Sequence, residues 1–237
     1  MPDDDSLTAC LPSNPFASRF VKAGAMVYRH PETLSAIGVL DLVAHLEQVR
    51  FGSIEGDHGT GKSTLLHCMA TALMQRFPGG QWVQLGRDPA MSWLGRIVQR
   101  IDNAVASWRA QTRTAAGGVL VVDGAEQLPP GVLTCLRMRA KFRGQVCLIT
   151  THKPRWGFAC LHRTSLNQRL VETMFAELVA SIPEATVREK IDKHFRTLDL
   201  SEFSNVRDLW SSLYDWVERE HSGTRESRPP RESDRLN

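Results

Sequence analysis

Residues 56–63 read Gly56-Asp57-His58-Gly59-Thr60-Gly61-Lys62-Ser63, which matches the phosphate-binding loop pattern G-x-x-x-x-G-K-[ST] at every specified position. Glycines in this pattern let the backbone curl until successive N–H groups point at phosphate oxygens. The lysine reaches the β and γ phosphates, and the hydroxyl of the last residue binds Mg²⁺. The octapeptide therefore predicts a nucleoside triphosphate site, with Lys62 on the phosphates and Ser63 on the metal.

The sequence on both sides of the loop favours a strand, the loop and a helix, in that order. Residues 50–55 can form a short strand, and residues 64–74, which begin at Thr64, contain no Gly or Pro and suit a helix. The loop then lies at a helix N-terminus, where unpaired N–H groups and the macrodipole favour an anion. We expect all residues from Gly56 to Thr64 to bind the nucleotide. The alternative is a glycine-rich turn with an accidental Lys-Ser pair.

The composition is that of an ordinary globular protein. The chain has 237 residues, enough for one α/β domain and a small appendage, with 42% hydrophobic and 23% charged residues. Its 29 Lys and Arg against 26 Asp and Glu leave a net charge of +3. This charge is too small to indicate a nucleic-acid or anionic-membrane partner.

The cysteines and the apolar segments indicate the compartment. Five cysteines, an odd number, occur without any C-x-x-C pair, so we expect reduced, mostly buried thiols and neither a disulfide framework nor a zinc site. No apolar stretch approaches the roughly 20 residues that span a bilayer. The acidic start, Asp3-Asp4-Asp5, differs from the basic start of a signal peptide. We therefore expect a cytoplasmic protein with no membrane partner.

Strand-like and helix-like segments alternate along the middle of the chain. The expected strands after the loop are 81–85, 118–123, 145–150 and 161–166, and the expected helices are 33–49, 90–110, 131–142 and 167–181. This alternation is typical of βαβ units, in which helices cover both faces of a parallel sheet. We expect a three-layer α/β/α core.

The domain organisation follows from changes in this pattern. Residues 1–32 are expected to form an N-terminal arm, and residues 33–182 the α/β core. After Pro183 only helical patterns remain, with a break near 200–205, so residues 183–220 are expected to form a small helical lid. The polar, Arg-rich residues 221–237 are expected to be a disordered tail.

A second nucleotide-binding signal is the apolar run 119–123, which ends in Asp123 and resembles the Walker B strand of phosphate-loop ATPases. A carboxylate at this strand end would hold Mg²⁺ beside Ser63. In many such ATPases a glutamate that activates water follows directly. Here Gly124 and Ala125 intervene, so Glu126 is the candidate general base. The alternatives are a core strand with a turn Asp, and a solvent-exposed Glu126.

A third signal ends the strand 145–150. In the additional-strand (ASCE) class of phosphate-loop ATPases, a polar residue called sensor 1 ends a strand between the Walker A and Walker B strands and contacts the γ-phosphate or the water. Thr150 and Thr151 suit this role, and His152 is a third candidate. The alternative is a strand that ends in Thr before a Lys153-Pro154 turn.

Together, the segments 56–64, 119–126 and 146–154 resemble AAA+ and related STAND-like ATPases of the additional-strand class. The resemblance implies that residues 14–20 contact adenine, although Phe16 and Phe20 could instead be core anchors. It also implies that Arg207, early in a lid helix with Asn205 as its N-cap, touches the γ-phosphate as sensor 2. Arg163 would act as an arginine finger in trans, which requires a homo-oligomer.

The resemblance implies the cofactors ATP and Mg²⁺ and the hydrolysis of ATP, coupled to a shape change that an unidentified partner protein reads. The guanine-reading motif Asn-Lys-x-Asp is absent, which favours adenine. Three alternatives remain open. They are a nucleotide-dependent switch or adaptor that hydrolyses weakly, a small-molecule kinase and a DNA-directed motor.

Overall fold

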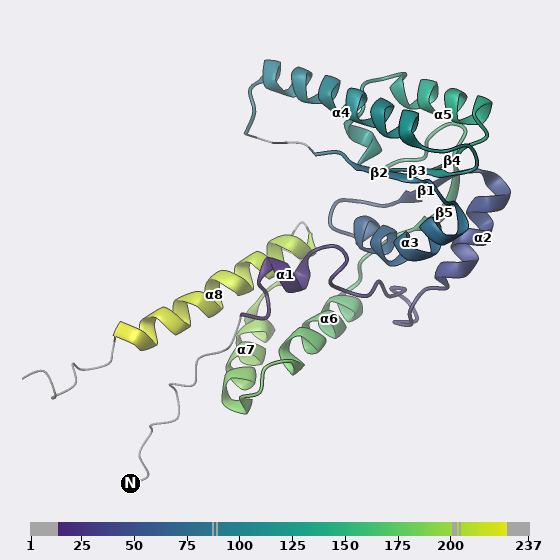
Figure 1. Cartoon of the computed structure of the whole chain (residues 1–237). Helices are drawn as coiled ribbons and strands as arrows, with labels where there is room; N and C mark the ends of the chain where they lie inside the picture. The colour runs from purple at the N-terminus through teal and green to yellow at the C-terminus, as the bar shows by residue number, and fades with distance from the viewer. Residues whose placement is uncertain (1–13, 87, 89, 201–202, 204, 227–237) are drawn as a thin grey trace, which may run out of the picture. The chain divides into compact units, whose positions relative to one another are not determined.

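The computed structural model describes residues 14–226 except 87, 89, 201, 202 and 204 (Figure 1). These residues form two compact units, which are described separately. The core is Ala23–Asn167, and the helical unit combines the segment that ends at Lys22 with the chain from Gln168 onward. The expected boundary lies between residues 182 and 183, whereas the two units divide one helix earlier, between Asn167 and Gln168.

The core is built on a sheet of five parallel strands in the order β2-β3-β4-β1-β5. The strands are β1 Phe51–Glu55, β2 Gln81–Gln84, β3 Val119–Asp123, β4 Val146–Thr151 and β5 Ala159–Arg163. The parallel sheet predicted from the alternation of segments is confirmed. Strand β4, which carries the sensor candidates, lies between the strand of the loop and the strand of Asp123. This is the strand order of the additional-strand phosphate-loop NTPases.

Helices cover both faces of the sheet, which gives the three expected layers (Figure 1). Helices α2 (Val39–Val49) and α3 (Lys62–Arg76) lie on one face, and α4 (Trp93–Arg113) and α5 (Val132–Phe142) lie on the other. Each face has its own apolar cluster. Val121 and Leu148 point to the α3 side, whereas Leu120 and Ile149 point to the α5 side. The α/β/α core is therefore confirmed.

Helix α2 begins later than expected. The sequence pattern predicts a helix over 33–49, but the helix starts at Val39, with Gly38 as its N-cap. Leu34 adopts a left-handed φ of 55°, and Arg29 and Ala36 form an isolated antiparallel bridge. This turn prevents residues 33–38 from joining the helix.

The helical unit contains α1 (Ser18–Val21), α6 (Gln168–Ala180), α7 (Ala185–Thr197) and α8 (Val206–Glu226). Phe16 is buried between the rings of Phe175 and Trp210, with centroids 6.1 and 5.8 Å away, so it is a core anchor of this unit. Phe20 is exposed. Helix α8 continues past residue 221, where the tail is expected to begin. The expected tail residues 227–237 and arm residues 1–13 lie outside the described residues.

The expectation of mostly buried thiols is wrong for the cysteines that the structure describes. Cys147 is buried within β4, and burial raises the pKa of its thiol to about 12. Cys135 and Cys160 are exposed, because they lie on outward positions of α5 and the edge strand β5. All four described cysteines are free, and Cys10 lies outside the described residues. In the same part of the chain, none of the helices has the length and apolar character required to cross a bilayer.

Candidate nucleotide-binding site

The loop between β1 and α3 depends on its glycines. Gly56, Gly59 and Gly61 have φ values of 151°, 73° and 92°, a region that side chains disfavour. A Cβ atom on Gly56 would lie 2.2 Å from the Oγ1 atom of Thr164. The backbone curl expected from the sequence is therefore present, and Gly61 leads directly into the first turn of α3. The N–H groups of that turn are free for an anion.

Thr164, which follows β5, braces the loop from the side. Its Oγ1 atom lies 2.6 Å from the Oγ1 atom of Thr60, and its backbone N–H donates to the Glu55 carbonyl at 2.7 Å. Thr60 in turn donates to the Asp57 carbonyl at 2.9 Å. These contacts hold the loop in its curled form without using the N–H groups at the start of α3.

The Lys62 ammonium lies within the loop. Its Nζ atom donates to the carbonyls of Gly56 and Asp57, each at 2.6 Å. Burial lowers the pKa of Lys62, and the nearby carboxylates of Glu126, Asp57 and Asp123 oppose this shift. A polyphosphate bound here would supply further negative charge to this desolvated ammonium.

The half-buried Ser63 at the start of α3 lies beside the buried Asp123 and Thr150 at the ends of β3 and β4. The Asp123 Oδ1 atom accepts hydrogen bonds from Ser63 Oγ at 3.1 Å and Thr150 Oγ1 at 2.7 Å. Its Oδ2 atom is buried and has no hydrogen-bond partner among the described residues. An unpartnered carboxylate oxygen beside a serine hydroxyl fits Mg²⁺, which usually takes one or two protein carboxylates and retains waters. The described residues contain no cluster of three or more His, Cys, Asp or Glu suited to a metal.

The two threonines that end β4 point to opposite faces. Thr150 continues the α3 side of the strand, donates to Asp123 and accepts a hydrogen bond from the Gly124 N–H at 2.7 Å. The Thr151 hydroxyl donates instead to the Lys153 carbonyl at 3.1 Å. The structure therefore brings Thr150 to the metal candidate and leaves Thr151 away from it.

Glu126 reaches the loop in spite of its displaced position in the sequence. Gly124 takes a left-handed φ of 88°, and the 3-10 turn Ala125–Gln127 follows. The Glu126 Oε1 atom lies 3.2 Å from the Nε2 atom of His152. This distance suits an ion pair with a protonated ring, but the two atoms do not form a hydrogen bond. The Oε2 atom is buried, with no hydrogen-bond partner in the described chain. Its charge acts on Lys62 and His58.

His152 connects this carboxylate to the loop. Its Nδ1 atom donates to the Gly56 carbonyl at 3.0 Å and lies 3.4 Å from the Lys62 Nζ atom. The His58 ring lies 3.9 Å from the His152 ring, centroid to centroid. Burial lowers the pKa of His58, and the charges of His152 and Lys62 add to this effect. The sequence offers His152 only as a third sensor candidate. Its contact with Glu126 depends on the pairing of strands, which local sequence does not reveal.

Glu55 is a buried carboxylate next to the loop that the sequence did not predict. Glu55 accepts a hydrogen bond from Ser53 Oγ at 3.0 Å and pairs with Arg163 at 3.2 Å. The parallel register aligns Glu55 with Arg163, so only the register could have indicated this pair. Arg163 therefore contacts a carboxylate of its own chain, and its role as a finger in trans stays a prediction.

Arg207 and the expected adenine-contacting segment belong to the helical unit. The Asn205 Oδ1 atom accepts hydrogen bonds from the N–H groups of Arg207 and Asp208, each at 3.0 Å, so Asn205 caps α8 as expected. The Arg207 side chain is exposed. Asn14 donates to the Tyr214 carbonyl at 3.1 Å within the same unit. The contacts of Arg207 with the γ-phosphate and of residues 14–20 with adenine stay predictions.

Comparison with known proteins does not assign a family. No protein-family model and no curated protein matches the sequence. The chain is similar to domain III of the replication initiation protein DnaA from Thermotoga maritima, with a TM-score of 0.47, 15% identity and coverage of 78% of this chain and 82% of that one. It is also similar to the Pif1 helicase from Candida albicans, with a TM-score of 0.31, 15% identity and coverage of 66% and 47%. These scores are low, so the assignment to the phosphate-loop fold rests on the chain's own strand order and loop.

Proposed function

We propose that this protein binds ATP, hydrolyses it with the aid of Mg²⁺ and couples hydrolysis to a conformational change that a partner protein reads. The observation that supports this function is the pair of buried carboxylate oxygens beside the loop, Asp123 Oδ2 and Glu126 Oε2, which lack hydrogen-bond partners among the described residues. A buried polar atom without a partner is costly and calls for a functional explanation. Asp123 Oδ2 is suited to bind a metal ion, and Glu126 Oε2 is suited to accept a hydrogen bond from a water.

The loop would bind and stabilise the phosphates. Its N–H groups and the Lys62 ammonium face the developing negative charge of the transferred phosphoryl group. Ser63 and Asp123 would hold Mg²⁺, which neutralises charge on the phosphate oxygens. Thr150 keeps the Asp123 carboxylate oriented through the bond to Oδ1.

Glu126 would accept the proton of the attacking water at its Oε2 atom. The His152 Nε2 atom lies 3.2 Å from the Oε1 atom on the opposite side of this carboxylate and would pair with it when the ring is protonated, while Nδ1 donates to the Gly56 carbonyl. His152 is thus a positioning residue that fixes the base relative to the loop. The proposed mechanism is an in-line attack of water on the γ-phosphate.

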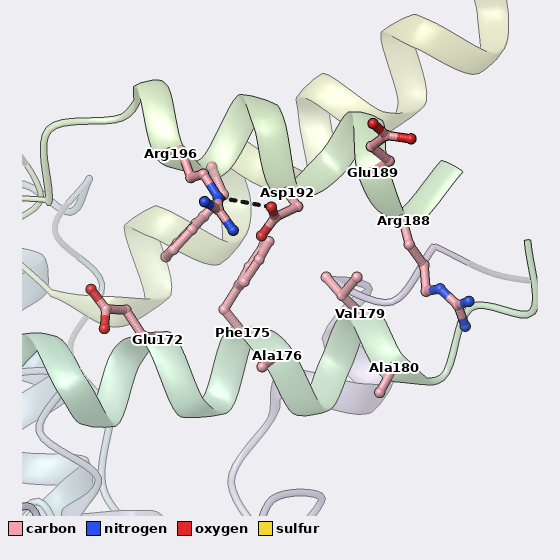
Figure 2. A pocket seen from close by; sticks show the side chains of 10 residues that line it. Glu172, Phe175, Ala176, Val179, Ala180, Arg188, Glu189, Asp192 and Arg196 are labelled. Atoms are coloured by element: carbon pink, nitrogen blue, oxygen red, sulfur yellow. Dashed lines mark hydrogen bonds and ion pairs between the residues drawn. The ribbon is translucent and has the colours of Figure 1, made fainter. Parts of the chain in front are cut away.

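The test compares nucleotide binding with phosphate release for Glu126→Gln and Lys62→Met. We expect Glu126→Gln to bind a fluorescent ATP analogue like the unmodified protein but to lose about 10²-fold or more of its turnover. Lys62→Met should lose binding as well. Glu189→Gln makes the same carboxylate-to-carboxamide change at an exposed position of α7 (Figure 2) and is the matched control. Unchanged turnover in Glu126→Gln would contradict the assignment of the base.

A second candidate function is a switch or adaptor that hydrolyses weakly. The position of His152 Nε2, 3.2 Å from Glu126 Oε1, favours it, because pairing with a protonated histidine would restrain the carboxylate. His152→Ala separates the two functions in a single-turnover assay. Turnover should fall if His152 positions the base, and rise if His152 restrains it. The fate of the γ-phosphate also separates hydrolysis from kinase activity, since a kinase would place it on an acceptor metabolite.

A further inference from the structure

Helix α4 presents its polar side to the sheet and its apolar side to solvent. Ser107 and Gln111 are fully buried, whereas Leu94, Val98 and Ile101 are 57%, 57% and 54% exposed. An amphipathic helix of a globular protein ordinarily has the opposite arrangement. We call the exposed set the apolar stripe, and it consists of Leu94, Ile97, Val98, Ile101, Val105 and Trp108.

Hydrogen bonds hold α4 in this orientation. The Gln111 Nε2 atom donates to the Leu136 carbonyl of α5 at 2.6 Å, and the Asn103 side chain donates to the Gly86 carbonyl after β2 at 3.1 Å. The Ser107 hydroxyl donates to the Asn103 carbonyl at 2.8 Å. Turning the helix to bury the stripe would break the bonds of Gln111 and Asn103. The outward direction of the stripe is therefore specified by the core.

The spacing of the stripe suits a second helix. Leu94, Ile97, Ile101 and Trp108 occupy a and d positions of a heptad pattern, and this seam extends for about 20 Å. At its C-terminal end, a groove of about 610 Å³ lies between α4 and the start of α5, lined by Val105, Trp108 and Val132 among others. Such a groove accepts one bulky apolar side chain of a docked helix.

The edges of the stripe are positively charged. Helical geometry places Arg100 along one edge and Arg109 and Arg113 along the other. Helices α4 and α5 together carry seven Lys or Arg, four on α4 and three on α5, against the single Asp102, although the whole chain has a net charge of only +3. A second copy of this surface would repel the first, so charge complementarity favours an acidic occupant.

We propose that the apolar stripe of α4 is the docking site for an acidic amphipathic helix of a partner protein. Apolar side chains of the partner would pack on the stripe and in the groove, and its Asp and Glu would face the flanking arginines. Arg100 already donates to the Leu128 carbonyl at 3.2 Å, so Arg109 and Arg113 are the main charged contacts. None of these residues belongs to the nucleotide site, so this inference stands apart from the proposed hydrolysis.

The probe is a fluorescent helical peptide of about four turns, with Leu at a and d positions and Glu beside them. A matched peptide has Lys in place of every Glu. Titrated with the full chain in an anisotropy assay, the Glu peptide should bind at least about tenfold tighter than the Lys peptide, and added salt should reduce the difference.

Two kinds of variant test the surface. Ile101→Gln or Val98→Gln should weaken binding of the Glu peptide by about tenfold or more. Leu40→Gln, at an exposed apolar residue of α2, should leave that binding unchanged. The double variant Arg109→Glu with Arg113→Glu should reverse the preference, so that the Lys peptide binds better. Unchanged circular dichroism and thermal unfolding would show that these variants remain folded.

Four results would overturn the proposal. They are equal binding of the two peptides, Glu-peptide binding that survives both stripe variants, a concentration-dependent dimer that Ile101→Gln abolishes, and stripe-dependent binding to phosphatidylserine vesicles without preference for the Glu peptide. The dimer would assign the stripe to a second copy, and the vesicles would assign it to a lipid surface.

Discussion

Helices α3 and α4 cover opposite faces of one sheet and use opposite chemistry to do so. Helix α3 buries Leu65, Leu66 and Leu73 completely, whereas the fully buried side chains of α4 are Ser107 and Gln111. Apolar burial holds α3 in place, and its first turn carries Lys62 and Ser63, which we propose bind the phosphates and the metal. Hydrogen bonds orient α4. Its apolar side chains therefore face solvent and do not pack in the core. The first helix serves the fold and the proposed nucleotide site, and the second serves the proposed contact outside the core.

The largest expected effect is on stability, and it should separate the two helices. Leu66→Ala on α3 should lower the free energy of unfolding by about 2–5 kcal/mol, because it leaves a cavity in the core. Ile101→Ala on α4 should change it by no more than about 0.5 kcal/mol, as is usual for exposed sites. Urea unfolding followed by circular dichroism measures both. A loss for Ile101→Ala as large as that for Leu66→Ala would mean that the stripe is covered by this chain.

The two faces should also differ in catalysis at the end of β4. Thr150→Val removes the hydroxyl that orients Asp123, so turnover should fall by about 10–100-fold. Thr151→Val, the same change one residue later on the opposite face, should have little effect. Phosphate release under saturating ATP measures both variants. Equal losses would contradict the assignment of the sensor role to Thr150.

The hydrogen bonds that orient α4 can be tested at Gln111. Gln111→Ala should lower the free energy of unfolding by about 1–3 kcal/mol, because the buried Leu136 carbonyl loses its donor. Thr112→Ala, at an exposed neighbouring position, is the control. If the two variants are equally stable in urea unfolding, hydrogen bonding does not hold the helix.

The smallest expected effect is a pH dependence on the α3 side of the sheet. Burial, with help from the charge of His30, lowers the pKa of His162 below 6.5. Between that pKa and 6.5 the unfolded chain binds more protons, so this contribution to stability rises with pH and levels off above about 6.5.

His162→Gln should therefore flatten part of the rise in urea midpoint between about pH 5 and pH 7. Ile101→Gln should leave the pH dependence unchanged, since α4 contains no histidine. A slope that stays the same in His162→Gln would contradict the assignment.

Much of the core could be predicted, because buried parallel strands are continuous apolar runs. The run that ends in Asp123 is an example, and the loop glycines indicate their own conformation. Sequence periodicity could not show which side of α4 faces the sheet, because the partner of Gln111 is the Leu136 carbonyl, 25 residues away. The choice between Thr150 and Thr151 needed the register of β4 with its neighbours. The contact of Glu126 with His152 needed the left-handed turn at Gly124.

The brace of Thr164 against Gly56 and Thr60 has a consequence for the order of folding. Thr164 follows the last strand of the sheet, while the loop follows the first, so the brace closes a contact between residues more than a hundred positions apart. Such nonlocal contacts form late. The loop therefore reaches its binding shape only after β5 has docked. A nucleotide that binds there as proposed would bind the completed core and stabilise it by mass action.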